Sequence, residues 1–125
     1  MNALLLLVHG SPREESNTDM FAVVEDIRSG GRWPLVEVGF LDCNQPDVPS
    51  AIDRCVEMGA TRIVGVPYFL HSGRHLTRDL PDLLEAGARR HPKTTILLGD
   101  SLGEEPVIAE IILDRIAEAK DVQGG

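Results

Sequence analysis

The sequence predicts an α/β protein built on a doubly wound, four-stranded parallel sheet. Four short apolar segments have the pattern of strands, and each is followed by a segment whose apolar residues repeat at helical spacing. Units of strand and helix in this alternation form a parallel sheet, and each crossover returns with the same hand. We therefore expect helices on both faces of the sheet.

The strands are expected over residues 4–8, 35–41, 62–67 and 94–98. Three of them are aliphatic runs, which is typical of strands buried on both faces. The segment 35–41 alternates instead, with Glu37 and Gly39 on one side and Val36, Val38 and Phe40 on the other. This alternation predicts an edge strand with one face less covered. The simplest strand order is then 2-1-3-4, with the topological switch between the first and third strands.

Each strand is followed by a predicted helix. Ser16 is expected to cap the first, the second follows Pro49 and Ser50, and Pro81 is expected near the first turn of the third. Pro106 begins the last helix, whose apolar stripe is wider than one small sheet needs. The repeating positions are Met20, Val23, Val24 and Ile27; Ile52, Cys55, Val56 and Gly59; Leu80, Leu83, Leu84 and Gly87; and Val107, Ile108, Ile111, Ile112 and Ile116.

Length and charge limit the classes of function. A chain of 125 residues suits one domain, expected over 1–119 and followed by a frayed tail over 120–125. A net charge of −8 argues against a nucleic-acid partner. The longest apolar run, 3–8, is too short to span a membrane, and only two residues precede it, which predicts no signal peptide. Cys43 and Cys55 have no metal-ligand or redox spacing, which favours two partly buried, reduced thiols in the cytoplasm.

Three of the four histidines are expected to meet at the topological switch. His9 follows the first strand, and His71 and His75 follow the third. Ligands of doubly wound sheets bind there, beyond the carboxyl ends of the strands. The placement favours a functional role for His9 and His75 and leaves His71 open, whereas His91, in a polar segment, is expected to be solvated.

The residue types at this point indicate metal chemistry. Neutral imidazole binds divalent transition metals, so His9 and His75 predict an exchangeable metal site. Asp42, at the end of the second strand, is either a further ligand or a turn residue. Arginines in the two flanking loops predict an anionic ligand, with solvated loop residues as the alternative; they are Arg13, Arg74 and Arg78.

Common phosphate and hydrolase motifs are absent from the loop after the first strand. The loop after the first strand has neither Gly-x-Gly-x-x-Gly nor the P-loop Gly-Lys-Ser/Thr, and it contains no Gly-x-Ser-x-Gly elbow. Histidine phosphatases also have a His-Gly pair after a strand, but Val8 stands where they have an arginine. A phosphohydrolase with His9 as nucleophile is therefore the runner-up enzyme.

The segments LLLLVHGSPREESN, FLDCNQPDVPSAID and VPYFLHSGRHLTRDLPDLL occur in this order. They resemble the short form of the CbiX/SirB class II chelatases, which insert cobalt, iron or nickel into sirohydrochlorin-type tetrapyrroles. The first is similar to the family's strand with its His-Gly-Ser loop. The third resembles its stretch of Pro, Gly-x-His and Asp-Leu-Pro. The middle segment matches one that commonly reads Phe-Leu-Glu, so the resemblance covers essentially the whole chain.

The resemblance implies a chelatase-like fold and a lyase of cobalamin or siroheme biosynthesis. His9 and His75 would be the catalytic, metal-handling pair, and Asp42 stands where many relatives have a Glu. The implied contacts with an anionic tetrapyrrole come from Ser11, Arg13, Gly73, Arg74, Arg78 and His71. The metal, Co²⁺ or alternatively Ni²⁺ or Fe²⁺, would be a substrate, and no tightly bound cofactor is implied.

The resemblance also bears on assembly. Long members of the family contain two such units in one chain, so a single unit implies a homodimer, with the last apolar stripe as part of its interface. A non-enzymatic carrier of metal or tetrapyrrole would share the same ligands and is the alternative outside catalysis. The physiological metal and the pathway do not follow from the sequence.

Overall fold

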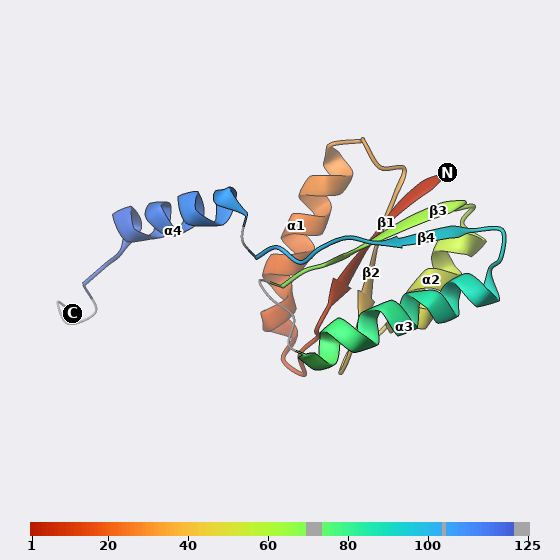
Figure 1. Cartoon of the computed structure of the whole chain (residues 1–125). Helices are drawn as coiled ribbons and strands as arrows, with labels where there is room; N and C mark the ends of the chain where they lie inside the picture. Colours follow the sequence, from red (N-terminus) through yellow and green to blue (C-terminus); the bar gives the residue numbers. More distant parts are fainter. Residues whose placement is uncertain (70–73, 104, 122–125) are drawn as a thin grey trace.

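Four parallel strands form one sheet in the order β2-β1-β3-β4, which confirms the predicted topology (Figure 1). The computed structural model describes residues 1–69, 74–103 and 105–121, except the side chains of Glu14, Ser16 and residues 74–77. The strands are β1 (Asn2–Val8), β2 (Leu35–Phe40), β3 (Arg62–Pro67) and β4 (Thr95–Leu98).

The pairing of the strands brings three of their carboxyl ends together. Val8 of β1 lies opposite Phe40 of β2, and Leu7 lies opposite Pro67 of β3. The chain segments that leave β1, β2 and β3 therefore start side by side at one edge of the sheet. This edge contains the predicted switch between β1 and β3.

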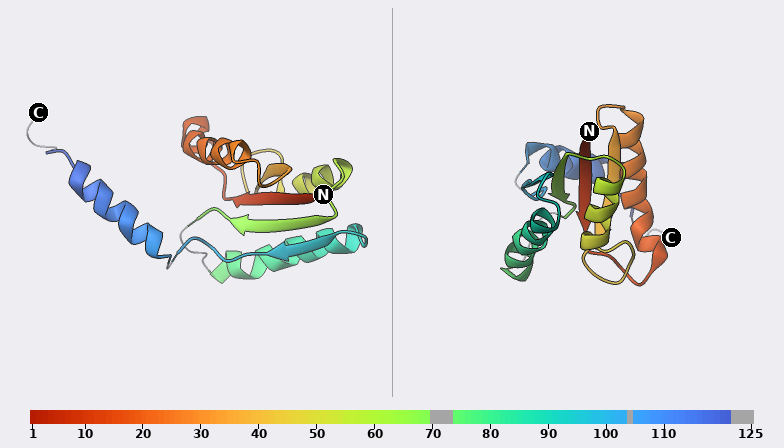
Figure 2. Two further views of the ribbon diagram at one scale, coloured as in Figure 1. Left: turned by 90° about the horizontal axis from the view of Figure 1, so that it is seen from above. Right: turned by 90° about the vertical axis from the view of Figure 1, so that its right-hand side faces the viewer.

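The helices are α1 (Thr18–Ser29), α2 (Val48–Glu57), α3 (Arg74–Arg90) and α4 (Pro106–Glu118), with a 3-10 turn η1 (Glu14–Asn17) before α1. Figure 2 shows α1 and α3 on opposite sides of the sheet. α2 shares the side of α3, where its residues belong to the same buried cluster. Helices thus cover both faces, as predicted.

The two faces of β1 anchor two separate buried clusters. Leu5 and Leu7 pack with Ile52 of α2 and Leu84 of α3. The intervening residues, including Leu6, pack with α1. Burial of one such leucine side chain contributes about 1.5–3 kcal/mol, so the central strand is the main hydrophobic support of the sheet.

β2 differs from its prediction on one point. It is an edge strand, as expected, but both of its faces are covered. Only Glu37 is half-buried, while the other five residues of the strand are buried. α2 covers one face and α1 the other, so the polar position Glu37 did not signal an uncovered face.

Three helix starts also differ from their predictions. The η1 turn occupies the position of Ser16, so that α1 begins only at Thr18. α2 begins earlier than expected because Asp47 caps it, its Oδ1 accepting a hydrogen bond from the Ser50 amide at 2.9 Å. α3 extends back to Arg74, which places Pro81 inside the helix. Pro81 is exposed there, and a proline inside a helix removes one backbone hydrogen bond.

α4 begins at Pro106 as predicted but does not pack on the sheet. It projects away from the other elements (Figures 1 and 2), and none of its residues is buried. Four of its large apolar side chains are more than half exposed, namely Val107, Ile112, Leu113 and Ile116. The prediction of one domain over 1–119 with a frayed tail stays a prediction.

The sheet has a strip that its helices cover only in part, which consists of Val64, Val66 and Leu97. The register aligns Val64 with Leu4 on one side and Leu97 on the other, so the strip lies on the face that α1 covers over β1 and β2. Val64 and Val66 are half-buried and Leu97 is 39% exposed. Within the described ranges, no helix has the length and apolarity needed to cross a membrane.

Candidate functional site

The loop after β1 carries the predicted histidine. His9 directly follows β1 and is exposed, while Ser11 is half-buried. The backbone amide of Ser11 donates to Oδ1 of Asn44 at 2.7 Å, and the Ser11 hydroxyl accepts from the amide of Arg13 at 3.2 Å. The loop is thus held by its own hydrogen bonds and by the neighbouring loop, with the imidazole at the carboxyl edge of the sheet.

Gly10 allows this loop to pack directly on the loop after β2. Its φ is 94°, in the left-handed region that favours glycine. A Cβ at this position would lie 2.0 Å from the carbonyl oxygen of Asp42. A larger residue would force the two loops apart, so the His-Gly pair has a structural reason independent of chemistry.

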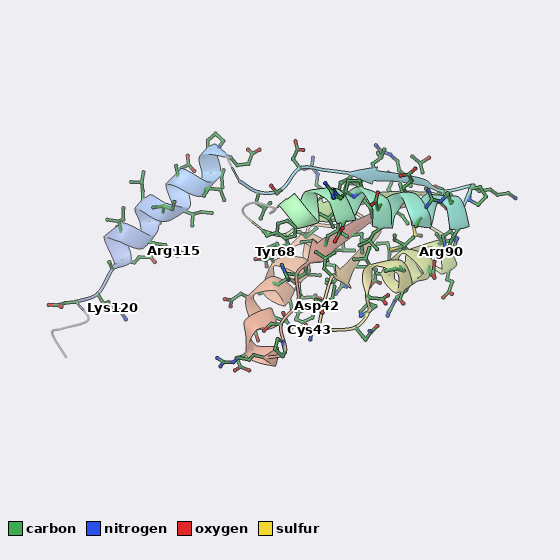
Figure 3. The ribbon with its side chains drawn as sticks, turned by 60° about the horizontal axis from the view of Figure 1, so that its bottom comes forward. Asp42, Cys43, Tyr68, Arg90, Arg115 and Lys120 are labelled. Carbon is green, nitrogen blue, oxygen red and sulfur yellow. The ribbon has the colours of Figure 1, made fainter. Side chains whose placement is uncertain are left out.

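The loop after β2 begins with Asp42, beside His9. The amide of Asp42 donates to the carbonyl of His9 at 3.0 Å. The Asp42 carboxylate accepts from the amide of Cys43 at 2.8 Å and is otherwise exposed (Figure 3). Asp42 therefore acts as a turn residue and also lies next to His9. Its role as a ligand stays a prediction.

The loop after β3 completes the described part of this edge. The amide of Tyr68 donates to the carbonyl of Leu7 at 2.8 Å, which continues the pairing beyond β3. The carbonyl of Phe69 accepts from the amide of Leu102 at 3.1 Å. Segments following β1, β2, β3 and β4 are thus connected along one edge.

Several predicted site residues lie outside the described part of the chain. His71 and Gly73 fall in the gap at 70–73. Arg74 and His75 form the start of α3, but their side chains are not described. The structure therefore brings together His9, Ser11 and Asp42, and the meeting of His9 with His75 remains a prediction. Arg13 and Arg78 are exposed.

The described residues do not form a closed metal site. Among residues 1–69, 74–103 and 105–121, no three side chains of His, Cys, Asp or Glu gather in a way that could hold a metal ion. His9 with Asp42 alone would supply few ligands. Such a set suits an ion that enters and leaves, because structural zinc sites use four protein ligands.

Comparison with known proteins identifies the family. The CbiX family model matches residues 3–119. The chain belongs to the CbiX family. The resemblance of its motifs is thereby confirmed.

The relatives of this CbiX chain include longer proteins and proteins of similar length. The sirohydrochlorin ferrochelatase of Priestia megaterium is 32% identical over 118 residues, which cover 94% of this chain and 44% of that protein. The sirohydrochlorin cobaltochelatase of Sulfolobus acidocaldarius is 32% identical over 124 residues, which cover 99% and 97%. The chain thus spans less than half of the first relative and nearly all of the second.

Solved structures have the same fold as this CbiX chain. The sirohydrochlorin chelatase SirB from Bacillus subtilis subspecies spizizenii in complex with cobalt gives a TM-score of 0.86 at 26% identity, covering 94% of this chain and 50% of SirB. The putative cobalamin biosynthesis CbiX protein from Marinobacter aquaeolei gives 0.81 at 24% identity, covering 94% and 96%. The latter supports the fold alone.

His91 of the CbiX chain is not a solvated residue, and that prediction is wrong. Its Nε2 lies 2.7 Å from Oδ1 of Asp53, and the His91 side chain is only 23% exposed. Arg90 adds an ion pair to the same oxygen at 3.1 Å. The hydrogen bond from His91, followed by that from Arg90, holds the pKa of Asp53 below its usual range. These residues join α3 to α2, and Figure 3 shows Arg90 far from Asp42.

The two cysteines are free thiols, as predicted, but neither is partly buried. Cys43 is exposed and Cys55 is fully buried. Burial raises the pKa of the Cys55 thiol to about 11. Cys55 is therefore a core residue without the thiolate that a nucleophile or a ligand needs.

Sequence reasoning missed Asn44. Its side chain makes the hydrogen bond between the loops after β1 and β2, yet it belongs to no predicted site. The available signal was its position, a polar residue in the segment that follows the second strand at the switch. That signal does not distinguish Asn44 from an ordinary turn residue.

Proposed function

We propose that this CbiX-family chain is a sirohydrochlorin chelatase, a lyase that inserts a divalent metal ion into a tetrapyrrole. The observation that carries the proposal is the exposed His9 at the end of β1, at the switch point of a sheet that superimposes on SirB. Relatives named as cobaltochelatases and ferrochelatases support the same reaction.

The proposed mechanism needs two chemical groups of the protein, a metal ligand and a base. Insertion replaces two pyrrole N–H protons with the ion, so one group presents the metal and another accepts protons. Neutral imidazole can do both, and we assign these roles to His9 and His75. Asp42 would assist as a ligand or by orienting His9, to whose backbone it is bonded.

The proposed substrate is an anionic tetrapyrrole. Guanidinium groups bind carboxylates in bidentate fashion. Arg13, in the loop that follows His9, and Arg78, on α3, are both exposed. In a chain with a net charge of −8, such residues would create a local positive region. The further residues proposed to contact substrate are Ser11, Gly73, Arg74 and His71.

The metal is proposed to be a substrate and not a resident cofactor. Co²⁺ is our first choice, with Ni²⁺ and Fe²⁺ as alternatives, because imidazole accepts all three. The two free thiols support a cytoplasmic location for the reaction, since disulfides are rare there.

We also propose that the chain works as a homodimer. α4 exposes a broad apolar surface, and the strip formed by Val64, Val66 and Leu97 is only partly covered. Both parts of this interface occur once in every chain, so two copies related by a two-fold axis can cover each other's strip with α4.

The function is tested by metal insertion into sirohydrochlorin, followed by absorption with Co²⁺, Ni²⁺ and Fe²⁺ in turn. His9→Ala and His75→Ala are expected to lower the rate about 100-fold or more, because general acid–base groups contribute rate factors of this order. His91→Ala is the matched control, since His91 lies on the α2–α3 contact, and it should retain the rate. Wild-type rates in both site variants, or phosphate release from a phosphoester without metal insertion, would contradict the assignment.

A further inference from the structure

The loops after β1 and β2 are paired beyond the ends of their strands. The amide of Leu41 donates to the carbonyl of Val8 at 2.8 Å, and the amide of Asp42 donates to the carbonyl of His9 at 3.0 Å. These bonds keep the two segments side by side past the ends of β1 and β2, as far as the candidate histidine. The backbone of His9 is therefore fixed on its carbonyl side.

The β2 loop then reverses in a tight turn. The amide of Asn44 donates to the carbonyl of Asp42 at 2.8 Å, which closes a three-residue turn around Cys43. Cys43 has a φ of 67°, a conformation that costs of order 1–3 kcal/mol for a residue other than glycine and persists only when its surroundings hold it. The turn directs the Asn44 side chain back toward the β1 loop, where it contacts Ser11.

Asn44 makes the second hydrogen bond that restrains the β1 loop, after the one between the Asp42 amide and the His9 carbonyl. Its Oδ1 accepts from the amide of Ser11 at 2.7 Å, and both residues are half-buried. Gly10 lies between the two fixed peptide groups, and a Cβ on it would lie 3.0 Å from the same Oδ1. The peptide groups before and after Gly10 are thus bound to Asp42 and Asn44, respectively.

We propose that Asn44 is a positioning residue for His9. The His9 side chain is exposed, and the hydrogen bonds at the His9 carbonyl and the Ser11 amide hold the backbone from which it projects. Asn44 acts through its Oδ1 and does not need to touch metal or tetrapyrrole. The inference rests on the proposed role of His9 in metal insertion.

The proposal predicts different outcomes for two substitutions. Asn44→Ala removes the acceptor and leaves the Ser11 amide without its partner. Asn44→Asp keeps an oxygen at the same position and retains the hydrogen bond. Asp47→Ala is the matched control, because it removes the side-chain cap of α2 from the same loop without touching Ser11.

The first measurement is amide hydrogen exchange at Ser11 in the full chain. Asn44→Ala is expected to accelerate this exchange about tenfold or more, whereas Asn44→Asp and Asp47→Ala leave it near the wild-type rate. This measurement does not depend on catalysis. Unchanged exchange in Asn44→Ala would overturn the proposed restraint even in a chain that inserts no metal.

The second measurement is the kinetics of metal insertion. Asn44→Ala is expected to lower kcat about tenfold while the KM for sirohydrochlorin changes less than about threefold, because a misplaced group loses rate more than substrate binding. Asn44→Asp should recover most of kcat. A wild-type kcat in Asn44→Ala, or an equal loss in Asp47→Ala, would contradict a positioning role, whereas an inactive wild-type chain would refute the proposed function.

Discussion

The backbone conformation of Gly10 determines how closely the loops after β1 and β2 pack at the site. Its φ is positive, and a Cβ at this position would lie only 2.0 Å from the Asp42 carbonyl oxygen, which leaves no room for a side chain. The residue that follows the proposed metal-handling His9 is therefore fixed by packing between two loops.

Gly10→Ala tests this packing. We expect a loss of unfolding free energy of about 2 kcal/mol or more, since both backbone strain and the collision oppose alanine. Gly31→Ala is the matched control, because Gly31 also has a positive φ, 72°, but has no atom within 4 Å of its Cβ position. Denaturant unfolding of both variants measures the difference, and equal losses would show that the loop contact is unimportant.

For single residues, the sequence predicted which residue types lie at the switch point, but it did not predict which side chains contact each other. The place of His9 at the carboxyl end of β1 was predicted correctly, because a strand pattern ends there at the expected switch. Asn44 and the pair of Asp53 with His91 could not be identified, because each contact joins residues more than thirty positions apart. Local patterns carry no information on which polar side chains meet across such a distance.

The contact between α2 and α3 includes a charged carboxylate, so its stability depends on pH. Asp53 on α2 accepts hydrogen bonds from His91 and Arg90 at the end of α3, and its pKa is lowered. A carboxyl whose pKa is lower in the folded state stabilises the fold above its ordinary pKa and loses that effect as the pH falls through the lowered value.

Asp53→Asn is expected to destabilise the protein at pH 7 by up to about 1 kcal/mol, a modest amount because the pair is partly exposed. The difference from wild type should shrink as the pH falls below about 4, where the wild-type carboxyl is protonated as well. Urea unfolding at several pH values measures it. Glu85→Gln, in an exposed pair with Arg89, should show no comparable loss. A difference that grows in acid would contradict the assignment.

At the scale of elements, periodicity predicted all four strands and helices but not all their starts. β3 has the predicted bounds, and α4 begins at the predicted Pro106. α3 begins before its apolar repeat, and Pro81 is tolerated inside it on an exposed surface. Helix starts depend on capping contacts such as that of Asp47 with Ser50, which periodicity does not report.

The whole molecule has an apolar surface that one chain does not cover. The sequence indicated the wide stripe on α4, but its projection from the sheet and the partly covered strip at Val64, Val66 and Leu97 became visible only in the structure. A monomer would expose both to water, and large exposed apolar patches mark interaction sites.

Ile112→Asp tests whether α4 joins two chains. The wild-type chain is expected to sediment at about twice 13.6 kDa at micromolar concentration, and Ile112→Asp as a monomer, because a buried charge without a partner opposes association. Glu110→Gln on the same helix is the control and should stay dimeric. A wild-type monomer, or a dimeric Ile112→Asp variant, would contradict the proposed interface.

The central claim is that this CbiX-family chain catalyses metal insertion. The most direct test measures how many moles of cobalt sirohydrochlorin form per mole of chain. The reaction is run under anaerobic conditions, and the product of the spontaneous reaction is subtracted. A chelatase predicts many turnovers in the wild type and the background rate in His9→Ala. Product that stops at one equivalent per chain would contradict catalysis and indicate a carrier instead.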